Sequence, residues 1–362
     1  MKNLLFVFLL LFLAACESSP KTEVENWEAQ ASRVEIIRDD FGVPHIYGKS
    51  DADAVFGMLY AQCEDDFPRV ERNYYWAIGR LAEVEGEDAL YSDLRARLYM
   101  TVDEAKAHYE SAPDWLKELC QAYADGINYY LHTHPEVQPK TIERFEPWFP
   151  MFFFEGSIGG DIESVSTRRI RAFYGENQQA MALEDFLPVD QFEEEPKGSN
   201  GFAISGEHTE SGNAMLLINP HTSFYFRGES QVVSEEGLNA YGATTWGQFF
   251  IYQGFNEHNG WMHTSTQVDF KDDFLETVEE RDGKLQYKYG EEWRDVWTSE
   301  VSLKYKDGDE MKERTFPMYR THHGPITGKI NDQWVSTALN WEPVDALIQS
   351  FTRTKTTNHD EF

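Results

Sequence analysis

The spacing of apolar residues divides the chain into a helical first half and a strand-rich second half. Between residues 50 and 132 apolar positions recur every three or four residues, which predicts α-helices over residues 51–62, 67–78, 90–100 and 115–131. Residues 34–37 and 45–47 read instead as short strands on either side of a turn at residues 39–42. After residue 199 the pattern alternates, and residues 285–289, 301–305 and 315–319 are predicted strands.

A hairpin is predicted where the second half begins. Residues 202–205 and 214–218 are apolar runs separated by a turn-rich stretch at residues 206–213. If the hairpin is centred on Glu210, positions whose numbers sum to 420 pair across it, so Ser199 pairs with His221. A slip of one or two residues in the register still leaves these two residues side by side.

The segment before the hairpin reads as a cleavable loop. Residues 190–198 are acidic and rich in turn formers, and they end in Gly198, directly before Ser199. Cleavage of the Gly198–Ser199 bond would leave a hydroxyl and a free α-amine on one residue. An α-amine has a pKa of about 7.7–8.0 and can therefore act as a base at neutral pH. This arrangement points to an N-terminal nucleophile hydrolase, and the absence of a Gly-x-Ser-x-Gly motif weakens the case for an α/β-hydrolase.

Three stretches carry a family resemblance. Ser-Asn-Gly-Phe-Ala-Ile-Ser-Gly from Ser199, followed by the apolar run into Asn-Pro-His221, resembles the start of the β-chain of penicillin acylases and acyl-homoserine lactone acylases. Residues 253–265, with Gly-Phe-Asn and Trp-Met-His-Thr-Ser, are similar to a second motif of that family, and residues 34–46 resemble the opening of its α-chain. The motifs occur in the expected order and cover most of the chain from Val34 to Phe362.

The resemblance implies a fold and roles for particular residues. The implied fold is α+β, the four-layer αββα sandwich of N-terminal nucleophile hydrolases, incomplete at the C-terminus because the family's second oxyanion donor, an Asn, would lie beyond Phe362. Ser199 would be the nucleophile, His221 would orient it, and Ser265 would contribute its backbone N–H to the oxyanion hole.

The resemblance also suggests a metal site, although the chemistry itself requires no cofactor. Glu163, Asp269 and Asp272 match positions that bind calcium in penicillin acylases, and carboxylate oxygens suit Ca²⁺. In a chain with 63 acidic residues the same three residues can equally be solvated surface charges. Both readings stay open at this point.

The function expected from these motifs is hydrolysis of the amide bond of an acylated small molecule, after autocleavage at Gly198–Ser199. Penicillin-like compounds, acyl-homoserine lactones and acyl-peptides are all candidate substrates. The cleaved α- and β-chains would be each other's partners. The alternative is a surface-anchored binding or scaffold protein that keeps the fold without turnover. An intact Gly-Ser-Asn favours the enzyme, because a scaffold has no use for a cleavable bond before a serine.

The N-terminus indicates export. Residues 4–12 form an apolar run, too short to span a bilayer, after Lys2, and Leu-Ala-Ala-Cys16 matches a bacterial lipobox. We therefore expect a signal peptide over residues 1–15 and a polar tether over residues 16–32. An ordinary signal peptide with a chance cysteine is the alternative. Membrane attachment would come only through a lipid anchor at Cys16, in the bacterial cell envelope and facing the periplasm or the exterior.

The remaining divisions follow from the cleavage site. The α-chain would span residues 33–189 and be mostly helical, the spacer would span residues 190–198, and the start of the β-chain would span residues 199–362.

The composition bears on partners and on buried residues. The net charge of −31, with no basic cluster, argues against a nucleic-acid partner. Cys63 and Cys120 are either a disulfide or two buried thiols. The aromatic residues at 145–154 are either core or part of an acyl pocket.

Overall fold

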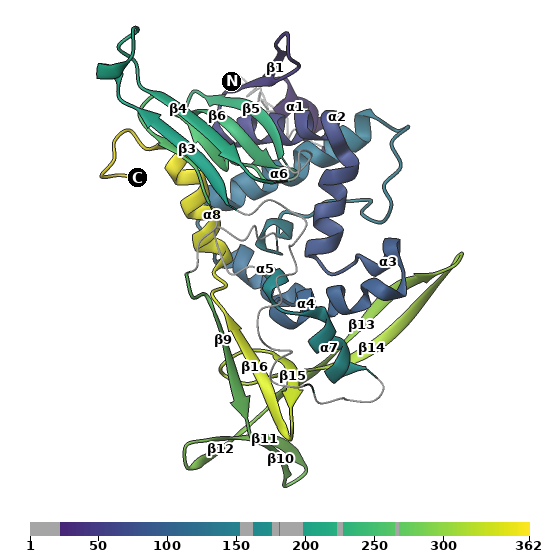
Figure 1. Ribbon diagram of the computed structural model, residues 1–362. Coiled ribbons are helices and arrows are strands. Elements are labelled where there is room, and N and C mark those ends of the chain that lie inside the picture. The colour runs from purple at the N-terminus through teal and green to yellow at the C-terminus, as the bar shows by residue number, and fades with distance from the viewer. Residues whose placement is uncertain (1–21, 153–161, 176–180, 182–197, 223–226, 265–267) are drawn as a thin grey trace, which may run out of the picture.

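Figure 1 shows the computed structural model, which describes residues 22–152, 162–175, 181, 198–222, 227–264 and 268–362. Helices dominate before residue 175 and strands dominate after residue 199. The α-helices are α1 Glu23–Ala31, α2 Asp51–Ala77, α3 Ala82–Glu85, α4 Leu90–Tyr99, α5 Val102–Ser111, α6 Asp114–Thr133, α7 Thr167–Tyr174 and α8 Pro343–Thr352. The predicted α+β class is confirmed.

The strands form five sheets. In chain order they are β1 Val34–Arg38, β2 Pro44–Gly48, β3 Ser199–Ile204, β4 Met215–Pro220, β5 Arg227–Ser234, β6 Asn239–Thr245, β7 Gln253–Phe255, β8 Gly260–Trp261, β9 Lys271–Glu276, β10 Val278–Arg281, β11 Lys284–Tyr289, β12 Glu292–Asp295, β13 Trp297–Asp307, β14 Glu310–Arg320, β15 Ile326–Ile330 and β16 Gln333–Leu339. The largest sheet has the order β1-β2-β5-β6-β7-β8. All its pairings are antiparallel except that of β2 with β5, which is parallel.

Helix α1 corrects one expectation from the sequence. Residues 23–31 were expected to belong to a polar tether, but they form a helix that begins with a reciprocal capping box between Thr22 and Glu25. Trp27 on this helix is buried, and its indole N–H donates to Asp125 at 2.8 Å. The helix is therefore attached to the protein core through the buried indole of Trp27, although the other residues of the helix are mostly polar.

The helical region forms one core with the large sheet. Helices α2 and α6 pack against each other, and α2 also packs on β2 and β5. The two helices predicted at residues 51–62 and 67–78 are confirmed as the two parts of α2, which are separated by a kink at Asp66, a non-helical residue with φ −158° and ψ 66°, two residues before Pro68. Helix α5, which the apolar spacing did not reveal, begins with a capping box between Thr101 and Glu104.

The two open alternatives on buried residues are resolved in part. Cys63 and Cys120 are buried free thiols, and burial raises the pKa of both. Phe145, Phe149 and Met151 belong to the core, whereas Phe152 also lines a small void. Phe153 and Phe154 lie outside the described residues. Within the described part of the chain no helix is long and apolar enough to cross a membrane.

A second core joins helix α7 to the strands after residue 270. Arg169 of α7 is buried, and its guanidinium donates to both carboxylate oxygens of Asp273 on β9 at 3.1 Å and to Thr327 on β15 at 3.2 Å. The sheet β15-β16-β9 and the long hairpin β13–β14 lie on this side of the molecule, below and to the right in Figure 1.

The hairpin β3–β4 presents an exposed apolar face. Phe202 pairs with Leu217 and Ile204 pairs with Met215, so the four side chains share one face of the ribbon. They are 62%, 50%, 42% and 57% exposed, respectively. The opposite face lies against the end of the large sheet, where Leu216 approaches Gly260 and Met262 approaches Gly201.

Candidate active site

Ser199 opens strand β3 at the mouth of the predicted hairpin. The hairpin forms as expected, but its register pairs Ser199 with Pro220 and Ile204 with Met215, so paired positions sum to 419 instead of 420. The shift of one residue lies within the slip allowed from the sequence. His221 therefore follows the residue opposite Ser199, and its backbone N–H donates to the Gly198 carbonyl at 3.2 Å.

The bond before Ser199 lies in a turn that suits glycine. Gly198 has φ +94°, a left-handed conformation that L side chains rarely adopt. The Ser199 hydroxyl donates to the Gly198 carbonyl oxygen at 2.7 Å. The hydroxyl oxygen is thus held beside the carbonyl of the peptide bond that precedes it, which is the group it would attack in a self-cleavage reaction.

The ring of His221 lies among amide side chains. Its Nε2 is 3.0 Å from Asn200 Nδ2 and 3.2 Å from Asn219 Oδ1, and these two asparagines face each other across the hairpin. The structure thus brings the backbone of His221 to the bond before Ser199, whereas the imidazole contacts residues on the neighbouring face.

A segment that follows β8 runs along the nucleophile strand. Thr264 Oγ1 donates to the Ser199 carbonyl at 3.5 Å. A Cβ at Gly201 would lie 2.0 Å from Met262 Sδ, so any larger residue there would have to displace the end of the flexible Met262 side chain. Ser265, the expected oxyanion donor, comes next in the chain and lies outside the described residues.

Between these two contacts, His263 points to a cluster that the motifs did not reveal. Arg353 Nη1 donates to His263 Nε2 at 2.9 Å, and the imidazole lies on Tyr252 with ring centroids 4.5 Å apart. The guanidinium of Arg227 lies over the same tyrosine ring, 4.3 Å from its centroid. Burial and the positive charges of Arg353 and Arg227 lower the pKa of His263 to about 4, so its ring is neutral at pH 7.

The expected calcium ligands do not converge. Glu163 lies in the short 3₁₀ helix η3 (Ile162–Ser164), Asp269 lies in the segment before β9, and Asp272 is in β9; all three are exposed. Among the described residues no group of three or more histidine, cysteine, aspartate or glutamate side chains is arranged to hold a metal ion. Calcium binding by these three residues therefore stays a prediction.

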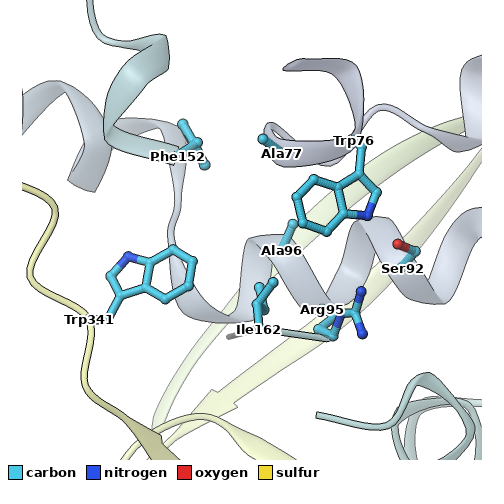
Figure 2. Close-up of a pocket in the computed structure, with 8 residues that line it drawn as sticks. All are labelled: Trp76, Ala77, Ser92, Arg95, Ala96, Phe152, Ile162 and Trp341. Atoms are coloured by element: carbon cyan, nitrogen blue, oxygen red, sulfur yellow. The ribbon is translucent and has the colours of Figure 1, made fainter. Parts of the chain in front are cut away.

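The void beside Phe152 is too small for an acyl group. Figure 2 shows Trp76 and Trp341 on its two sides, with Arg95 and Ile162 between them. Its lining comprises Trp76, Ala77, Ser92, Arg95, Ala96, Phe152, Ile162 and Trp341, and its volume is about 10 Å³. That volume is roughly what a single water molecule needs.

Comparison with known proteins identifies a family model and several relatives that are similar to this chain. The penicillin amidase family model matches residues 33–362. The chain is 23% identical over 367 residues to an acyl-homoserine lactone acylase QuiP of Pseudomonas fluorescens strain Pf-5, covering 87% of this chain and 44% of that protein. It is 27% identical over 346 residues to an acyl-homoserine lactone acylase PvdQ of Pseudomonas syringae pv. syringae, covering 86% and 43%.

Solved structures give a weaker match. A thermostable penicillin G acylase from Alcaligenes faecalis aligns with a TM-score of 0.38 and 19% identity, over 45% of this chain and 30% of that one. The chain spans less than half the length of the curated relatives described above.

Proposed function

Because this chain belongs to the penicillin amidase family, we propose that it supplies the nucleophile of an amidohydrolase, and that this nucleophile is Ser199 after cleavage of the bond to Gly198. The observation that carries the proposal is the 2.7 Å hydrogen bond from the Ser199 hydroxyl to the Gly198 carbonyl, in a turn with φ +94° at Gly198.

Self-cleavage would proceed through an ester. The Ser199 hydroxyl oxygen adds to the Gly198 carbonyl carbon, the carbon–nitrogen bond breaks, and the hydroxyl proton ends on the Ser199 nitrogen. Water then hydrolyses the ester, which leaves a carboxylate on Gly198 and restores the Ser199 hydroxyl. The backbone N–H of His221 donates to the Gly198 oxygen at 3.2 Å, so it is positioned to stabilise negative charge that develops on this oxygen.

Turnover would use the two groups that cleavage leaves on Ser199. The α-amine of Ser199 accepts the proton of the hydroxyl, and the hydroxyl oxygen attacks the amide carbonyl of the substrate. The carbon–nitrogen bond of the substrate then breaks, and the amine of the leaving group takes the proton from the α-ammonium. Water hydrolyses the acyl-serine in the second half of the reaction. We assign one donor of the oxyanion hole to the backbone N–H of Ser265, and we assign the orientation of the serine to His221.

The substrate class that we favour is an N-acyl-homoserine lactone. The two relatives described above are named as acylases of such lactones. A penicillin or an acyl-peptide presents the same amide to the same nucleophile. The acyl group therefore has to be identified by assay.

The first experiment tests processing. The natural full-length protein should run as two chains on a denaturing gel, and mass spectrometry should find an N-terminal serine at residue 199. Ser199→Ala should stay one chain. Cleavage before residue 199 in the Ser199→Ala variant would mean that an external protease is responsible.

The second experiment tests turnover. A panel of N-acyl-homoserine lactones and chromogenic amides with short, long and aromatic acyl groups should reveal hydrolysis by the processed protein, and specific acetylation of the new N-terminus should abolish it. Full activity after verified acetylation would rule out the α-amine as base and would point to His221. A single chain with no turnover across the panel would support the scaffold alternative.

We also propose that the protein is lipid-anchored at Cys16 in the bacterial envelope. The supporting observation is the Leu-Ala-Ala-Cys sequence after a short apolar run. Metabolic labelling with a fatty acid should mark the wild-type protein and not Cys16→Ala. Equal labelling of the two proteins would contradict the anchor.

A further inference from the structure

A histidine that none of the assigned roles uses lies one residue away from a contact with the nucleophile. His263 stands between Met262, which approaches Gly201, and Thr264, which donates to the Ser199 carbonyl at 3.5 Å. These two neighbours reach the strand that carries Ser199, whereas the ring of His263 contacts Tyr252 and Arg353 on the other side. The residue therefore joins the nucleophile strand to a separate cluster.

The hydrogen bond to Arg353 fixes the state of the ring. A guanidinium has only donors, so Nε2 of His263 must be an unprotonated acceptor, and the proton of the neutral ring lies on Nδ1. The backbone of the same residue is also held, because Gln253 Nε2 donates to the His263 carbonyl at 3.0 Å. Both the side chain and the main chain at this position are thus anchored.

Hydrogen bonds hold Arg353 and the residues after it against the segment around β7. Its Nη2 donates to the Tyr252 carbonyl at 3.1 Å. Asn256 Nδ2 donates to the carbonyls of Thr354 and Thr356, at 3.1 and 2.9 Å, so the residues that follow Arg353 are bound to the turn between β7 and β8. The position of the guanidinium is therefore set by these contacts, and its hydrogen bond to His263 in turn sets the position of the imidazole.

Packing alone does not require a histidine here. Nδ1 of His263 is buried and has no hydrogen-bond partner among the described residues. A buried donor without a partner is unfavourable, so a residue that only filled space would be better served by an apolar side chain. The acceptor nitrogen that faces Arg353 is the feature that a leucine would lack.

We propose that His263 is a positioning residue for Ser199: by accepting a hydrogen bond from Arg353, its imidazole locates residues 262–264 against the strand that carries the nucleophile. This inference rests on the proposed function, because it gives His263 a role in aligning that same serine. His263 touches neither the serine nor, on this proposal, the substrate. It acts through the contacts of Met262 and Thr264.

The test compares three variants in the natural full-length protein. His263→Leu removes the acceptor, His263→Gln restores an acceptor oxygen, and His258→Leu removes an exposed histidine from the nearby turn as a matched control. Misplacement of a reacting group by about 1 Å costs on the order of 100-fold in rate. We expect kcat to fall roughly 10- to 100-fold in His263→Leu with KM nearly unchanged, to recover to within about threefold in His263→Gln, and to be unaffected in His258→Leu.

A second measurement does not depend on turnover. Hydrogen exchange of the backbone amides at residues 200–204 should be faster in His263→Leu than in the wild type, and near the wild-type rate in His263→Gln. If the wild type hydrolyses no member of the substrate panel, the proposed function fails and the exchange rates still decide this inference. Equal exchange in all variants, or equal loss of kcat in His263→Leu and His263→Gln, would overturn it. If His263→Leu does not fold, His263→Asn takes its place.

Discussion

The conformation at Gly198 leads to a prediction about the rate of processing. Gly198 has φ +94°, and a Cβ added there would find its nearest atom, Thr264 Oγ1, at 4.0 Å. Among the described residues an alanine thus meets no steric clash, and the cost that remains is backbone strain. That strain is about 1–3 kcal/mol for a non-glycine residue in a left-handed conformation.

Relief of this strain by rotation of the backbone at residue 198 would turn the Gly198 carbonyl. This oxygen accepts from the Ser199 hydroxyl at 2.7 Å and from the His221 N–H at 3.2 Å, so rotation of the peptide disturbs both hydrogen bonds. If 1–2 kcal/mol of the strain appears in the barrier to self-cleavage, Gly198→Ala should mature about 5- to 30-fold more slowly than the wild type. The rate is measured as the loss of precursor on a denaturing gel after synthesis is stopped.

A matched control exists at the far end of the same hairpin. Gly212 has φ +74° and also has open space around its Cβ position, so Gly212→Ala carries comparable strain away from the cleaved bond. It should lose stability without slowing maturation. Gly198→Asn should be intermediate, because asparagine tolerates positive φ better than alanine. Maturation of Gly198→Ala at the wild-type rate, or equal slowing in Gly212→Ala, would refute the reasoning.

Three further predictions concern stability. Burial raises the pKa of Asp93 to about 7, and its carboxylate accepts two backbone N–H groups at 2.8 Å, so Asp93→Asn should turn an amide donor towards one of them and cost about 1–3 kcal/mol in urea unfolding. A Cβ at Gly254 would lie 2.1 Å from the Tyr241 carbonyl oxygen on the paired strand. Gly254→Ala should therefore lower the free energy of unfolding by about 3 kcal/mol or more in the same assay. An unchanged free energy would mean that the two strands can move apart. The pKa of His263 is lowered to about 4 from 6.5, so its contribution to folding is fully present above pH 6.5 and is lost as the pH falls towards 4. The free energy of unfolding of the wild type, measured relative to His263→Gln, should therefore decline by roughly 2–3 kcal/mol over that range. A difference that stays constant with pH would contradict the assigned pKa.

Local signals in the sequence predicted the hairpin and the main helices. The two apolar runs and the turn between them fixed the hairpin to within one residue, because strand alternation and turn chemistry are properties of adjacent residues. Helix α1 was missed because its burial depends on Trp27 finding Asp125, 98 residues away. The break predicted between residues 62 and 67 is confirmed as the kink at Asp66, where the backbone leaves the helical conformation shortly before Pro68.

The site was predicted only as far as its motif extends. Ser199 and His221 are joined by a short hairpin, so their proximity follows from spacing alone. The contact between His263 and Arg353 spans 90 residues and no motif links them. A histidine in the Trp-x-x-Thr segment was the one available signal. The carboxylates at 163, 269 and 272 were assigned by resemblance, and the described structure gives them no shared centre.

The parallel pairing of β2 with β5 determines what cleavage would do to the molecule. β2 precedes the Gly198–Ser199 bond and β5 follows it, and their pairing runs from His45 opposite Gln231 to Gly48 opposite Ser234. The main core likewise contains residues from both sides of the bond. Cleavage would divide this core of the described residues between the two products, so we expect folding to precede cleavage. Unfolding of the precursor is a unimolecular equilibrium, whereas reassembly of the cut protein would depend on concentration. The mature protein, once denatured and diluted, should therefore not renature as its precursor does.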